Sequence, residues 1–104
     1  MVSESLQEAL NKQINLELRA HYAYLALSAY FENIGLKGFA GWVYHHAEEE
    51  MVHAMKIYHY LHSRRERVKL FAIPEPTESW DSPLSALEYA LHHEEKVSAS
   101  INRL

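Results

Sequence analysis

Apolar residues recur every three or four positions over the first third of the chain, and this spacing predicts an amphipathic helix. The stripe consists of Leu6, Leu10, Ile14, Glu17, His21, Tyr24, Ser28 and Phe31. We expect the helix to cover about residues 5–33 and to end near Gly35. Ser5 and Glu8 have the spacing of a capping box, in which each side chain binds the backbone amide of the other.

A second stripe with the same period predicts a second helix over about residues 38–62. Its members are Phe39, Trp42, Val43, His46, Glu50, His53, Ile57, Tyr60 and Leu61. Only a short turn containing Gly35 and Gly38 separates the two helices. We therefore expect them to form an antiparallel hairpin.

Residues 63–82 break the helical pattern and contain Pro74-Glu75-Pro76, which predicts a connection rather than a helix. An extended segment of this length reaches roughly 60 Å at about 3.3 Å per residue, which exceeds the length of the second helix. We therefore expect a long crossover that makes the next helix parallel to the second one, as in some four-helix bundles.

The third helix is expected over residues 83–104, after a capping side chain in Asp81-Ser82 and with Pro83 in its first turn. Its stripe consists of Leu84, Leu87, Leu91, Glu94, Val97, Ser98, Ile101 and Leu104. Because no Gly, Pro or cap closes the pattern, we expect a helix that is cut rather than finished. The predicted fold is all-α: one bundle domain over 1–104, truncated within its third helix and in need of another surface to cover its stripes.

Composition and charge narrow the function classes. With 48% hydrophobic residues and only three Gly and three Pro in 104 residues, the chain is not disordered or low-complexity. A net charge of −4 gives no reason to expect a nucleic-acid partner. We find no signal peptide or membrane span, so we expect a soluble cytoplasmic protein without a membrane partner. Because cysteine is absent, any metal must be held by oxygen or imidazole ligands.

The most informative residues are polar side chains on the apolar stripes: Glu17, Glu50, His53 and Glu94. A buried carboxylate is costly unless it is paired or coordinates a cation. Glu50 and His53 are three residues apart, so both side chains reach one point in the interior. A Glu-x-x-His pair on its own is usually a surface pair, but three inward carboxylates favour a metal site. Such ligands suit iron or manganese, and the residues do not distinguish the two.

Other candidate residues are more ambiguous. Tyr24 lies two turns after Glu17 on the same face, where it is either a core residue or a neighbour of the metals. Glu49 either belongs to a solvated charge run or borders a further metal position. His21 and His46 are left unassigned, and we expect the remaining histidines to lie on the surface: His45, His59, His62, His92 and His93. Trp42 and Trp80 are expected to be packing residues.

The order Glu17, Tyr24, Glu49-Glu50-x-x-His53, long crossover and His93-Glu94 resembles the prokaryotic non-haem ferritins. The segments most similar to that family are residues 15–18 and 46–53. The resemblance implies a ferritin-like four-helix bundle in which Glu17, Glu50 and His53 bind a first iron, with Glu50 bridging to a second. It also implies Glu94 at the second iron, Glu49 at a third site, and Tyr24 beside the dinuclear centre.

The resemblance further implies a ferroxidase, with Tyr24 and Glu50 as catalytic residues, that oxidises Fe(II) with dioxygen or peroxide. The product would be stored as ferric mineral in a homo-oligomeric shell of 24 subunits. The fourth helix and its ligands have no counterpart in this sequence, so we expect the second iron site to be incomplete. Two alternatives stay open: a non-catalytic helical self-association module, and a short ferritin-like protein in which two chains share one metal site.

Overall fold

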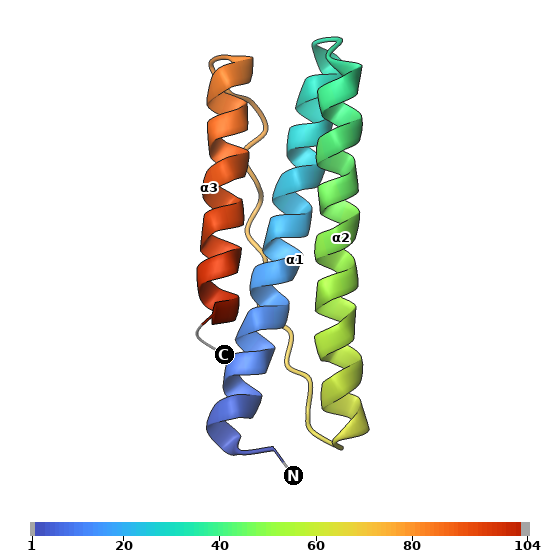
Figure 1. Ribbon diagram of the computed structural model, residues 1–104, viewed down its shortest axis with the longest axis vertical. Helices are drawn as coiled ribbons and strands as arrows, with labels where there is room; N and C mark the ends of the chain where they lie inside the picture. Colours follow the sequence, from blue (N-terminus) through green and yellow to red (C-terminus); the bar gives the residue numbers. More distant parts are fainter. Residues whose placement is uncertain (1, 103–104) are drawn as a thin grey trace.

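The computed structural model describes the backbone of residues 2–102 and the side chains of residues 2–93. Its described residues form three helices, α1 (Glu4–Asn33), α2 (Lys37–Ser63) and α3 (Pro83–Asn102), and no strand. In Figure 1, α1 rises from the N-terminus while α2 and α3 both descend beside it. The predicted all-α fold, antiparallel hairpin and parallel third helix are therefore confirmed.

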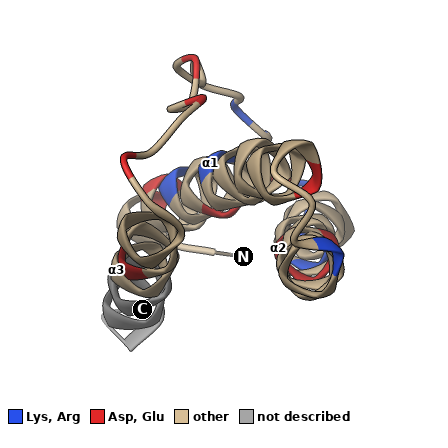
Figure 2. Ribbon diagram, turned by 90° about the horizontal axis from the view of Figure 1, so that it is seen from above, with Lys and Arg blue, Asp and Glu red and all other residues tan. Residues whose placement is uncertain are grey.

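Helix α1 lies between the other two helices and packs against both (Figure 2). Within the described residues, the backbones of α2 and α3 do not come close to each other, although side chains of both belong to one core cluster. One core cluster joins Tyr24, Leu27 and Phe31 of α1 to alanines of α2 and α3, and a smaller cluster joins Ile14 to Ala54 and Leu61 of α2. Small alanine side chains let the helices approach closely, so the bulky side chains of α1 fill both interfaces.

The first helix begins earlier than the sequence pattern predicts. Ser3, not Ser5, is the N-cap: its backbone is extended and its Oγ accepts from the Leu6 amide at 3.2 Å. The predicted capping box of Ser5 and Glu8 is wrong, because Ser5 already lies inside the first turn. The earlier start gains a further backbone hydrogen bond, from the Gln7 amide to the Ser3 carbonyl at 2.9 Å.

The crossover between α2 and α3 begins near Arg65 and ends at Ser82. Ser82 Oγ accepts from the Ser85 amide at 3.1 Å, and Pro83 is the first residue of α3, as predicted. At the other end, Arg65 adopts a left-handed φ of 57° while the Glu66 amide bonds to the Leu61 carbonyl at 2.9 Å. This is a Schellman closure in which arginine takes the position that glycine usually fills, and it turns the chain away from α2.

The crossover follows the outer side of α1 rather than that of α2. Asn11 is 5% exposed; its Nδ2 donates to the Arg67 carbonyl at 3.0 Å, and its Oδ1 accepts from the Lys69 amide at 2.8 Å. Higher up, the Tyr30 hydroxyl donates to the Trp80 carbonyl at 3.4 Å. Figure 2 shows the connection arching over one side of α1. Polar side chains of α1 thus replace the missing backbone partners of an irregular segment.

Replacing Asn11 by leucine is expected to lower the free energy of unfolding by about 2 kcal/mol, because the Arg67 carbonyl and Lys69 amide lose their partner. Urea denaturation measures the change. Asn15→Leu is the matched control, since the hydrogen bonds of Asn15 to the Phe71 and Ala72 carbonyls are longer, at 3.4 Å each. Equal losses in the two variants would contradict a special role for Asn11.

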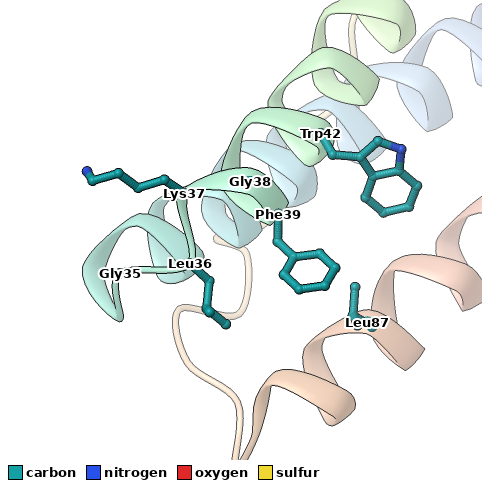
Figure 3. A pocket seen from close by; sticks show the side chains of 7 residues that line it. All are labelled: Gly35, Leu36, Lys37, Gly38, Phe39, Trp42 and Leu87. Atoms are coloured by element: carbon teal, nitrogen blue, oxygen red, sulfur yellow. The ribbon is translucent and has the colours of Figure 1, made fainter.

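An apolar pocket of about 660 Å³ lies between the start of α2 and α3. Figure 3 shows Phe39 and Trp42 of α2 facing Leu87 of α3 across it. Trp42 was expected to be a packing residue, but it is 54% exposed, because α2 and α3 do not close on each other here. Phe39 is 43% exposed for the same reason.

None of the described helices is both long and apolar enough to cross a membrane.

Candidate metal centre

Glu17 and Glu50 occupy core positions on the facing sides of α1 and α2. Glu17 is 0% exposed and Glu50 is 3% exposed. One turn away on each side of them lies a buried apolar residue: Ile14 and Ala20 on α1, Ala47 and Ala54 on α2. The helical period that buries these apolar residues therefore also buries the two carboxylates.

His53 joins the two carboxylates from the next turn of α2. Its Nδ1 lies 3.6 Å from Glu17 Oε2 and 3.9 Å from Glu50 Oε2. One potential ligand atom from each of the three residues lies within 4.8 Å of the other two. The His53 side chain is 45% exposed, whereas the carboxylates are enclosed. The group is thus a buried anionic pair with an imidazole at its solvent edge.

The Glu17 carboxylate is only half satisfied. Its Oε1 accepts from Gln13 Nε2 at 3.1 Å. Its Oε2 is buried and accepts no hydrogen bond from the side chains that the structure describes. Burying a carboxylate oxygen without a donor is costly, and a second carboxylate nearby adds repulsion. A cation bound between Glu17, Glu50 and His53 would relieve both costs, so this donor set fits a hard divalent metal.

Tyr24 also lies in the core, where it connects α1 to α3. It is 1% exposed, and its hydroxyl donates to the Ala90 carbonyl at 3.3 Å. Its ring centroid lies 6.1 Å from that of His46 and 6.3 Å from that of His93. His93 was expected on the surface, but it is only partly exposed. Its ring is partly buried, because α3 turns it toward Tyr24 and toward Tyr89, whose centroid is 4.6 Å away.

Of the other predicted site residues, Glu49 does not join the group within the part of the chain that the structure describes. The Glu49 side chain is 49% exposed, and its Oε1 lies 2.8 Å from His45 Nε2, one turn earlier on the outer face of α2. The Glu94 side chain lies outside the described residues, although the backbone of α3 passes through this position.

Two polar residues near the group carry contacts that the sequence interpretation did not assign. Gln13 is 2% exposed and bonds to Glu17, which lies one turn further along α1. Its position four residues before a predicted ligand was the available signal. His21 Nδ1 lies 2.6 Å from the Ala47 carbonyl, so this histidine links α1 to the backbone of α2.

Comparison with known proteins gives one consistent result. Residues 7–104 match the Ferritin family, described as a ferritin-like domain. Over all 104 residues the chain is 38% identical to a bacterial non-heme ferritin of Bacteroides fragilis, of which it spans 65%.

Solved ferritin structures share the fold. The open-pore ferritin of the hyperthermophilic archaeon Archaeoglobus fulgidus is 46% identical, with a TM-score of 0.93 over 99% of this chain and 64% of that chain. A humanized archaeal ferritin is 42% identical, with a TM-score of 0.93 over 99% of this chain and 62% of that chain. The chain thus spans slightly less than two thirds of these relatives. The helix order, the long crossover and the family match agree, and the chain belongs to the ferritin family.

Proposed function

We propose that the protein is an iron-storage ferroxidase whose iron-binding group contains Glu17, Glu50 and His53. One observation carries this proposal: the buried Glu17 Oε2 accepts no hydrogen bond within the described structure, yet it faces His53 Nδ1 at 3.6 Å. The similarity to a bacterial non-heme ferritin supports iron rather than manganese as the cation.

Iron is the substrate in this proposal, and the residues lower the cost of oxidising it. Two carboxylates stabilise Fe(III) more than Fe(II), because the Coulomb attraction grows with the charge of the cation. Each Fe(II) gives up one electron, and two such electrons reduce dioxygen to hydrogen peroxide or peroxide to water. His53 is the most exposed of the three proposed ligands, so we expect iron to enter and leave past its imidazole.

The remaining roles follow the ferritin resemblance. We assign Glu94 to a second iron that Glu50 bridges, Glu49 to a third and more exposed iron position, and Tyr24 to the surroundings of the centre. Storage of ferric mineral in a cytoplasmic homo-oligomeric shell of 24 subunits belongs to the same proposal. The kinship with solved archaeal ferritins supports it at the level of the family.

The test is an aerobic Fe(II) titration of the protein and of His53→Ala, with iron oxidised and iron retained counted per chain. We expect the wild-type protein to oxidise Fe(II), and His53→Ala to do so at least about tenfold more slowly, since the variant loses a direct ligand. Retention of tens of irons per chain would support mineral storage, whereas saturation near one or two would support the centre and contradict storage.

The matched control is His59→Ala, which removes an exposed histidine from the same helix. It is expected to oxidise iron at the wild-type rate. A wild-type protein that neither binds nor oxidises iron would overturn the proposed function, and so would equal rates in the His53 and His59 variants.

A further inference from the structure

Gln13 is a buried side chain that the proposed reaction does not use directly. It is 2% exposed, lies one turn before Glu17 on α1, and donates from Nε2 to Glu17 Oε1 at 3.1 Å. An ionised carboxylate only accepts hydrogen bonds, so the amide must present its NH₂ group to Glu17. Gln13 is therefore a hydrogen-bond donor to the Glu17 carboxylate.

The two carboxylate oxygens of Glu17 therefore have different neighbours. Gln13 occupies Oε1, while Oε2 faces His53 Nδ1 at 3.6 Å. The terminal torsion of a glutamate is broad, so an unrestrained carboxylate rotates freely between orientations. With Oε1 held by Gln13, Oε2 stays directed at the place where the ligand atoms of Glu17, Glu50 and His53 converge.

The donor is also neutral, and this matters for a site that binds cations. Within the described residues, no lysine or arginine forms an ion pair with Glu17. A cationic donor in place of Gln13 would hold the carboxylate equally well but would repel an incoming metal ion. An amide orients the carboxylate and leaves its negative charge to the metal.

We propose that Gln13 is a positioning residue that holds Glu17 in its metal-binding orientation through Oε1. The inference rests on the proposed function, since it assigns the neighbour of a proposed iron ligand. Outer-shell partners of this kind typically change metal affinity by 10- to 100-fold when they are removed. Gln13→Met removes the donor and keeps the length and unbranched shape of the side chain.

The probe is Co²⁺, which binds carboxylate and imidazole ligands and reports its coordination through visible absorption. Calorimetric titration gives the affinity, and the absorption spectrum gives the ligand geometry. We expect Gln13→Met to bind Co²⁺ about tenfold more weakly, with an altered spectrum, because the Glu17 carboxylate is no longer fixed. Gln13→Asn, which withdraws the amide by one methylene, is expected to show the same two changes.

Asn11→Leu is the matched control, because it removes another buried amide from α1 that bonds to the crossover instead of to a ligand. Below its unfolding temperature it is expected to keep the wild-type affinity and spectrum. If either Gln13 variant folds and binds Co²⁺ with unchanged affinity and an unchanged spectrum, the inference is overturned and the metal centre stands. If the wild-type protein itself binds no Co²⁺, the metal centre fails as well. Loss of affinity without a spectral change would mean a general structural effect, and would also overturn the positioning role.

Discussion

Replacing Glu17 and Glu50 together by glutamine is expected to abolish Fe(II) oxidation and, at the same time, to stabilise the metal-free protein. Both carboxylates lie in the core, at 0% and 3% exposure. Removing direct ligands costs more than the roughly 10- to 100-fold typical of residues that only orient them, so the rate should fall at least about a hundredfold. Removing two buried like charges should raise the free energy of unfolding by about 2 kcal/mol.

Iron oxidation is followed by ferric absorbance, and stability by urea denaturation in the presence of a chelator. The matched control is Glu8→Gln with Glu48→Gln, which removes two exposed carboxylates from the same two helices. It carries the same charge change, and is expected to alter neither quantity appreciably. A Glu17 and Glu50 variant that is less stable than the wild type, or that still oxidises iron, would contradict the buried-ligand interpretation.

Replacing Phe31 by alanine is expected to lower the free energy of unfolding by about 3 to 5 kcal/mol. Phe31 is fully buried and contacts the rings of Tyr30 and Phe39, with centroids 5.5 and 5.6 Å away. It lies in the cluster that includes residues of all three helices, so the cavity would loosen both interfaces of α1. Such a loss is a large fraction of the roughly 5 to 15 kcal/mol that stabilises a typical domain.

Urea denaturation monitored by circular dichroism measures this loss. Leu84→Ala is the comparison, because Leu84 is 65% exposed on α3 and its truncation should cost less than about 0.5 kcal/mol. Similar losses for the two variants would mean that Phe31 does not anchor the shared core.

Much of the fold could be predicted because the helical period is repeated over long stretches. The helices begin and end within one residue of the predicted bounds wherever the structure describes those ends, and the length of the crossover gave the direction of α3. The same period placed Glu17, Glu50 and His53 on inward stripes, and their ligand atoms do converge in the structure. Their role in iron chemistry stays a prediction.

Other features depend on contacts that a stripe does not encode. The pattern marks an apolar face, but it does not say whether a neighbour covers that face, and Trp42 is exposed for this reason. The inward turn of His93 and the path of the crossover along α1 both require the packing of distant segments. Gln13 was overlooked because a polar residue beside an apolar stripe is indistinguishable from a solvated one until its burial is known.

Because α1 lies between the other two helices, the described helices do not all unfold together: α3 opens more easily than the α1–α2 pair. Because the backbone of α3 lies close to α1 but not to α2, local opening of α3 breaks its contacts with α1 and with Trp80 of the crossover, including the bond from the Tyr24 hydroxyl to the Ala90 carbonyl. The α1–α2 pair, which carries Glu17, Glu50 and His53, stays intact through such an opening. The three proposed ligands are therefore expected to stay together when α3 detaches, without global unfolding.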